Sequence, residues 1–103
     1  MLIISTETIP DRDYEVLSIV SGSTIQTKDF MSDFTQGLKS MMGGEPKSYT
    51  DMMEKARTQA TARMVAQAQH LGADAIIGVR YTTSAIMAQA AEVLVYGTAI
   101  KFK

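Results

Sequence analysis

Two groups of polar residues in the sequence could form a ligand-binding site. The first is the loop Gly43-Gly44-Glu45, which precedes a predicted helix and is followed by Tyr49. Backbone N–H groups at a helix N-terminus attract phosphate and carboxylate groups. However, the loop lacks the Gly-Lys-Ser/Thr ending of a P-loop, and Glu45 would repel an anion. A turn that reverses the chain between two helices, with glycine at positive φ, explains the same residues.

The second group, Arg80, Glu92 and Tyr96, falls on two strands predicted to be neighbours. A cross-strand Arg–Glu pair is one interpretation. Ligand binding is the other, because Arg80 is flanked by apolar residues and a partly buried guanidinium needs a partner. Catalysis would also need a pocket and a perturbed pKa. We predict no catalytic residue, and the candidate ligand-binding residues are Gly43, Gly44, Glu45, Tyr49, Arg80 and Glu92.

The sequence offers few metal ligands, since it has no cysteine, one histidine (His70) and 8 methionines. Soft metals prefer Cys or Met, and borderline metals prefer His. Met41-Met42 and Met52-Met53 could approach each other across the Gly-Gly turn, although Met also fills irregular space between helices. We therefore predict no metal-ligating residue and no cofactor within one chain. A ring of copies could still place one His or Glu from each chain around a symmetry axis.

Charge and hydropathy argue against two classes of binding partner, nucleic acids and membranes. The chain has 10 Lys and Arg against 11 Asp and Glu, for a net charge of -1, whereas nucleic-acid binders need a basic surface. No apolar run approaches the about 20 residues of a membrane span, and residues 1–5 lack the basic start of a signal peptide. Absence of cysteine suits a reducing compartment. We expect a cytoplasmic protein that binds neither nucleic acid nor membrane.

Strands at both ends of the chain are expected to position these residues. The expected strands cover residues 2–4, 14–20, 75–83 and 92–102. Gly22 is interpreted as a hairpin turn or a bulge, because residues 24–27 still alternate like a strand. In the third strand, one face is expected to carry Ile77, Val79 and Tyr81, and the other Ile76, Gly78 and Arg80. Small residues at 84–91 are expected to form a connection.

Two helices are expected between the second and third strands. The shorter one begins at Asp29 and ends at Gly43-Gly44. The longer one covers residues 48–71, with Ser48 as its N-cap and Gly72 just beyond its C-terminus. Its apolar stripe consists of Tyr49, Met52, Met53, Ala56, Ala60, Met64, Ala68 and Leu71. Small alanine side chains in this stripe allow close approach to a sheet.

The last strand is apolar on both faces. A sheet covered by one layer of helices should instead have one polar face exposed to solvent. One face carries Val93, Val95, Gly97 and Ala99, and the other Leu94, Tyr96, Thr98, Ile100 and Phe102. In a chain of 103 residues, which fits one domain over 1–103, we expect another subunit to cover the second face. Leu94→Asp or Val95→Asp is therefore expected to disrupt a homo-oligomer.

Stretches along the whole chain carry a family resemblance. They are Ile19-Val20-Ser21-Gly22-Ser23, Gly37-Leu38-Lys39, Gly43-Gly44-Glu45, Tyr49-Thr50, Ala56-Arg57, residues 71–81 and residues 92–99. In these stretches the chain resembles the YbjQ-like family, small uncharacterised bacterial proteins that carry a heavy-metal-binding label. The resemblance implies an α+β fold like a dodecin subunit and a ring-like homo-oligomer, a pentamer. It implies no established reaction.

From the residues we expect an α+β domain with a curved antiparallel sheet, one long helix and one shorter helix. We predict a small homo-oligomeric binding or scaffold protein, with a ligand site between subunits and no enzymatic reaction. A site between subunits explains why one chain shows no motif. Two alternatives stay open: a heavy-metal-binding protein, as the family label suggests, and a small enzyme that uses Glu45, Tyr49 or the Arg80–Glu92 region.

Overall fold

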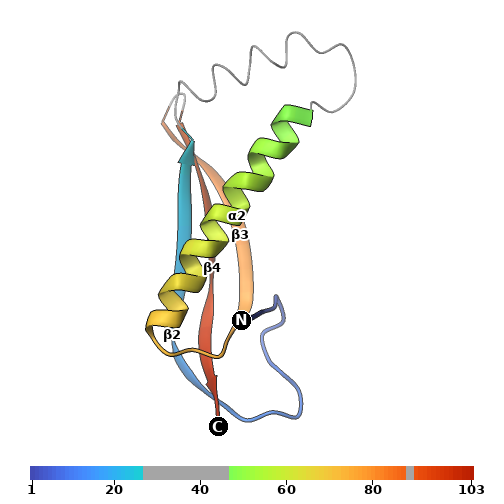
Figure 1. Ribbon diagram of the computed structural model, residues 1–103, viewed down its shortest axis with the longest axis vertical. Helices are drawn as coiled ribbons and strands as arrows, with labels where there is room; N and C mark the ends of the chain where they lie inside the picture. Colours follow the sequence, from blue (N-terminus) through green and yellow to red (C-terminus); the bar gives the residue numbers. More distant parts are fainter. Residues whose placement is uncertain (27–46, 88–89) are drawn as a thin grey trace.

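A computed structural model describes residues 1–26, 47–87 and 90–103, which form a sheet crossed by one long helix (Figure 1). The elements are β1 (Leu2–Ile3), β2 (Tyr14–Gln26), α2 (Lys47–His70), β3 (Ala75–Met87) and β4 (Ala90–Phe102). The strand order is β1-β3-β4-β2. The three long strands are antiparallel as predicted, but β1 pairs parallel with β3, so the sheet is mixed. The predicted shorter helix from Asp29 lies outside the described residues.

The long helix α2 is confirmed within one residue at each end, and it packs on β2 and β4. The predicted cap Ser48 lies one residue inside it. Beyond His70, Gly72 has a φ of 78°, which glycine adopts without steric cost. The Ala73 N–H donates to the Ala68 carbonyl and the Gly72 N–H to the Gln69 carbonyl, both at 3.0 Å. These two bonds form a Schellman motif that satisfies the last carbonyls of the helix.

The helix approaches β2 very closely, and Gly22 makes this possible. A Cβ atom at Gly22 would lie 2.0 Å from the carbonyl oxygen of Ala60. The predicted turn or bulge at Gly22 is therefore wrong, because β2 runs straight through it. The register shift of β2 lies instead between Val16 and Ser18. The predicted stripe is buried at Met52, Ala56, Ala60, Met64 and Ala68, whereas Leu71 is 45% exposed.

A bulge in β3 changes which residues share a face. The register shifts between Ile77 and Arg80, and Gly78 has a φ of 62°. The extra residue reverses the alternation of side chains beyond it. Ile76 and Val79 therefore share the core under α2, while Ile77 lies on the other side of the sheet. The predicted grouping of Ile77 with Val79 is wrong for this reason.

The last two strands also extend further than expected. Ser84 pairs with Glu92 and Ala85 with Ala91, so most of the predicted connection 84–91 belongs to β3 and β4. Small residues have weak strand propensity by themselves. Pairing with the neighbouring strand overrides that preference.

The face of the sheet away from α2 is covered at its lower end by the chain itself. There Ala75, Ile77 and Ile100 are buried, and Ile4, Ile9, Tyr14 and Phe102 pack against them. The Arg12 guanidinium lies 3.6 Å from the centre of the Phe102 ring, which ties the N-terminal segment to β4. This segment loops beside the lower end of the sheet in Figure 1. The expectation that a subunit covers this whole face is wrong for the lower end.

Candidate functional site

Above that end, the same side of the sheet has no cover among the described residues. We call it the open face: the side chains of β2, β3 and β4 turned away from α2, above Ile100. Its large apolar members are exposed, at 74% for Ile19, 57% for Ile25 and 42% for Tyr96, and Leu94 is half-buried. Val16, paired with Ile100 at its lower border, is 61% exposed. The open face is thus an apolar surface that also contains polar residues.

Both predicted strand residues, Arg80 and Glu92, lie on the open face, but the structure does not bring them together. Arg80 is paired with Tyr96, and Glu92 with Ser84 and Ile25. Four residues along a strand separate their positions by about 13 Å. The predicted cross-strand Arg80–Glu92 pair is therefore wrong.

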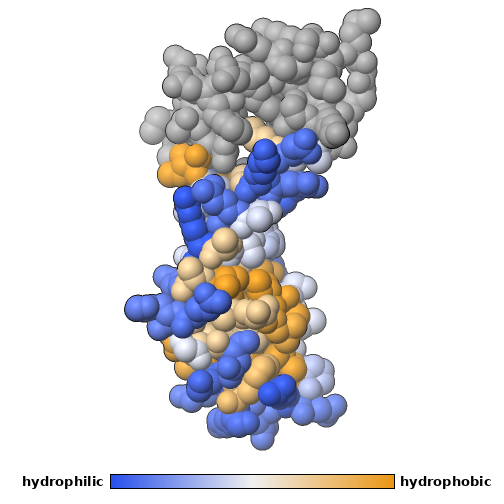
Figure 2. All heavy atoms as spheres, viewed as in Figure 1, coloured by the Kyte–Doolittle hydropathy of each residue, from blue (hydrophilic) through white to orange (hydrophobic). Residues whose placement is uncertain are grey.

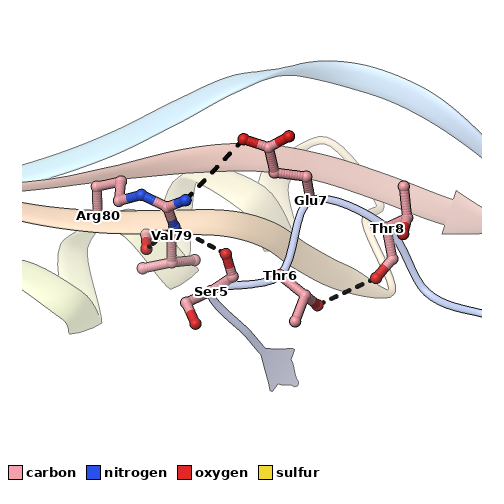
Figure 3. Close-up of polar contacts among 6 residues, drawn as sticks. All are labelled: Ser5, Thr6, Glu7, Thr8, Val79 and Arg80. Atoms are coloured by element: carbon pink, nitrogen blue, oxygen red, sulfur yellow. Dashed lines mark hydrogen bonds and ion pairs between the residues drawn. The ribbon is translucent and has the colours of Figure 1, made fainter.

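Arg80 instead holds the N-terminal segment against β3 (Figure 3). Its Nη1 donates to the Ser5 carbonyl at 2.7 Å and to the Val79 carbonyl at 3.0 Å. Its Nη2 lies 4.0 Å from Oε1 of Glu7, and the Arg80 side chain is 48% exposed. The guanidinium is thus partly buried and has partners, as its apolar neighbours in the sequence suggested. So exposed an ion pair is worth at most about 1 kcal/mol.

Of the other predicted site residues, the structure describes only some. Gly43, Gly44 and Glu45 lie outside the described residues, as do Met41 and Met42, and that loop stays a prediction. Tyr49 belongs to the first turn of α2. His70 is the last residue of α2 and is exposed. Within the described ranges, no three His, Cys, Asp or Glu side chains come close enough to hold a metal ion.

A groove between α2 and β3 was not foreseen from the sequence. It has a volume of about 720 Å³, and its described lining consists of Glu54, Arg57, Thr58, Thr61, Ala62 and Tyr81. The groove exists because α2 lies over β2 and β4 and leaves the upper part of β3 beside it. In the view of Figure 2, hydrophilic residues cover this part of the molecule and hydrophobic residues gather in the lower half.

Hydrogen bonds in the groove fix the direction of the Tyr81 hydroxyl. The Thr61 hydroxyl donates to the Arg57 carbonyl at 2.7 Å. Its single proton is then used, so the Tyr81 hydroxyl, 2.8 Å away, donates to Thr61 Oγ1. The Tyr81 oxygen can still accept a bond from a ligand in the groove, which Arg57 also lines. A small polar molecule fits this chemistry, and the described residues show no nucleophile paired with a base. Arg57 and Thr61 are four residues apart, and residues at this spacing lie on the same side of a helix. This spacing is the sequence signal that could have indicated that both side chains line one groove.

No helix in the described part of the chain has the combination of length and hydropathy needed to span a bilayer.

Comparisons with known proteins agree on one family and name no reaction. The YbjQ family profile, described as "Putative heavy-metal-binding", matches residues 1–103. A UPF0145 protein of Clostridium novyi is 54% identical over 101 residues, 98% of each chain. A UPF0145 protein of Archaeoglobus fulgidus is 46% identical over 104 residues, 100% of this chain and 96% of the relative.

A solved structure supports the fold. It is a protein of unknown function of the DUF74 family from Pediococcus pentosaceus. The TM-score is 0.69 at 20% sequence identity, over 100% of this chain and 98% of that one. At this identity the similarity shows the α+β fold alone.

Proposed function

This chain belongs to the YbjQ family, and we propose that it is a cytoplasmic, homo-oligomeric binding or scaffold protein rather than an enzyme. Its partner is itself, without nucleic acid or membrane, and residues 1–103 form its single domain. The open face carries this proposal. Apolar surface of this kind on a small domain marks a site of interaction.

The energetics favour covering the open face with protein. Fully burying one Val or Ile side chain stabilises a complex by about 1.5–3 kcal/mol before the costs of association. Val16, Ile19 and Ile25 each expose more than half of their surface. Three such side chains on one face, flanked by Leu94 and Tyr96, suffice for the centre of an interface.

The resemblance to the YbjQ-like family favours a ring of five. In such a ring, a ligand site between subunits would take its apolar wall from the open face and its polar groups from Arg80 and Glu92. Gly43, Gly44, Glu45 and Tyr49 remain candidates for a second part of that site.

Ile19→Asp tests this proposal, because it places a charge on the open face without touching the core under α2. We expect the native mass spectrum to change from an oligomer to a monomer, while far-UV circular dichroism stays the same. Ala66→Asp, at an exposed position of α2 outside the groove, is the matched control and should leave the subunit number unchanged. An Ile19→Asp protein with the parent's subunit number would contradict the proposal.

The structure also changes the choice of variants. Leu94 lies on the open face, so Leu94→Asp remains a test of assembly. Val95 is fully buried under α2, so Val95→Asp would disturb the fold of the protomer itself. The two substitutions are therefore not equivalent, although the residues are adjacent.

A heavy metal is the second candidate ligand, because the family description names it. The described residues of one chain do not supply a donor set, and the chain has no cysteine. In a ring of copies, a metal site would take one His or Glu from each chain around a symmetry axis, and His70 is the one histidine of the sequence. Elemental analysis of the untagged oligomer tests this: stoichiometric metal that His70→Ala removes would support it, and a metal-free oligomer would contradict it.

A further inference from the structure

The two flanks of α2 use their polar side chains in different ways. On the flank toward β2, the Ser21 N–H donates to Oε1 of Gln67 at 2.8 Å, and Nη1 of Arg63 donates to the Ser23 carbonyl. Both side chains of the helix thus bind the main chain of an edge strand. On this flank the polar groups serve the fold.

The flank toward β3 carries charged side chains that the fold does not use. Glu54 and Arg57 line the groove beside Tyr81, and both are exposed. Among the described residues, neither the Glu54 carboxylate nor the Arg57 guanidinium makes an ion pair or a hydrogen bond. Their spacing would permit an ion pair along the helix, but a pair of this kind is weak enough for a ligand to replace. The groove therefore offers one negative and one positive group to a bound molecule.

Tyr81 supplies a third group, and its chemistry is fixed. Because the Tyr81 hydroxyl donates its proton to Thr61 Oγ1, its oxygen can only accept a bond from a ligand. The Tyr81 side chain is 49% exposed, so its ring also offers an aromatic surface to the groove. An aromatic face attracts both alkyl chains and cations.

These three groups follow one another along the helix. Glu54 comes first, Arg57 lies one turn later, and Tyr81 is held at the level of Thr61. At 1.5 Å per residue, Glu54 and Thr61 are about 10 Å apart along the axis. The groove thus presents an acceptor, a donor and a second acceptor in a row. A complementary ligand carries a donor, an acceptor and a second donor.

We propose that the groove binds a small amino acid with a second amino group, such as lysine or ornithine. Its carboxylate pairs with Arg57, whose planar guanidinium can bind both oxygens. Its α-ammonium group pairs with Glu54. Its side-chain ammonium donates to the Tyr81 oxygen, while the alkyl chain lies against the ring. Arg57 and Thr61 are about 6 Å apart along the axis, which the four-carbon stem of lysine can span.

The size and place of the groove suit such a ligand. Its volume of about 720 Å³ lies within the range of small-molecule sites, about 300–1,000 Å³. Its described lining comes from one chain and lies on the helix side of the sheet, away from the open face. This inference goes beyond the proposed homo-oligomer and does not depend on it. Failure of one leaves the other standing.

Isothermal titration calorimetry with lysine and three analogues tests the order of groups. Norleucine lacks the side-chain amine, cadaverine lacks the carboxylate, and 6-aminohexanoate lacks the α-amine. Since the lining is exposed, we expect lysine to bind with a Kd of about 1 mM, and each analogue to bind about tenfold more weakly. No heat of binding with lysine at about 10 mM would overturn the inference, as would norleucine binding as tightly as lysine.

Variants of the groove assign each group of the ligand to its residue. Tyr81→Phe should weaken lysine binding about fivefold and leave norleucine binding unchanged, because norleucine has no amine to lose. Arg57→Gln should weaken lysine binding about tenfold or more and leave cadaverine binding unchanged. Lys55→Gln is the matched control, since it removes the same charge from α2 at a position that does not line this groove. An equal loss of lysine binding in Lys55→Gln would contradict the proposed site.

Discussion

The lower and upper halves of the sheet are built from the same three long strands, yet among the described residues only the lower half is covered on both faces. Ile100 of β4 is fully buried by the N-terminal segment, whereas Tyr96, four residues earlier on the same face, is 42% exposed. β1 likewise covers the edge of β3 only up to Val79. The comparison teaches that the chain covers its lower end by itself, whereas the apolar side chains at its upper end stay exposed among the described residues.

The helix does not cause this difference. Val20 and Val95, under the upper part of α2, are as completely buried as Ala99 in the lower half. The two halves differ on the other face and at the β3 edge, where a short N-terminal segment reaches only part of the way. Substitutions on that face can therefore test the comparison directly.

Ile100→Ala should have the largest effect on protomer stability. The side chain is fully buried between the sheet and the N-terminal segment, and removing it leaves a cavity. We expect the free energy of unfolding to fall by about 2–5 kcal/mol, measured by urea denaturation. A loss below about 1 kcal/mol would show that the lower half is not the self-sufficient part.

Gly22→Ala should rank next, because the added Cβ would meet the Ala60 backbone, which cannot move without shifting α2. Overpacking of this kind costs about 1–3 kcal/mol. Urea denaturation measures it, and Ser21→Ala on the neighbouring exposed position is the control. Equal stability of both variants would mean that the close approach of helix and strand is not maintained in solution.

Arg80→Ala should have a smaller and more local effect. Its bonds to the Ser5 and Val79 carbonyls are partly exposed, so we expect a loss of about 1 kcal/mol. Hydrogen exchange should increase at the amides of Gly78 and Val79, which the N-terminal segment protects. Arg57→Ala, elsewhere on the surface, should leave those amides unchanged. Faster exchange in both variants would contradict this role for Arg80.

Ile25→Ala should have the smallest effect on the separated protomer. It lies on the same face as Ile100 but is 57% exposed, so we expect a stability change within about 0.5 kcal/mol at low protein concentration. At high concentration the variant should dissociate more readily than the parent, measured by analytical ultracentrifugation. A large loss of protomer stability would show that the upper half is already covered within one chain.

Local patterns were sufficient to predict much of the fold. The Ala and Met stripe of α2 and the glycine after it predicted the helix and its end, because a 3.6-residue period and a positive φ leave direct traces in sequence. The alternation of residues 92–102 predicted β4 and its two apolar faces. The candidate site was harder to predict: Arg80 and Glu92 lie on neighbouring strands as predicted, but they do not meet.

The remaining features depend on contacts between distant residues. The bulge at Gly78 and the pairing of Leu2 with Ala75 leave no local pattern, since each depends on which strand lies alongside. For the same reason Arg80 was assigned the wrong partner, and Thr61 and Tyr81 were not expected to meet.

The sequence by itself determined the long helix, the three long strands, the small-residue face of the helix and the excess of apolar surface, because these follow from residue type and period. Only the tertiary structure decided where that excess lies. The N-terminal segment covers the lower end of the sheet, and Gln67 and Arg63 occupy the β2 edge. These are packing and hydrogen-bond choices between segments far apart in the chain, so they depend on the whole fold.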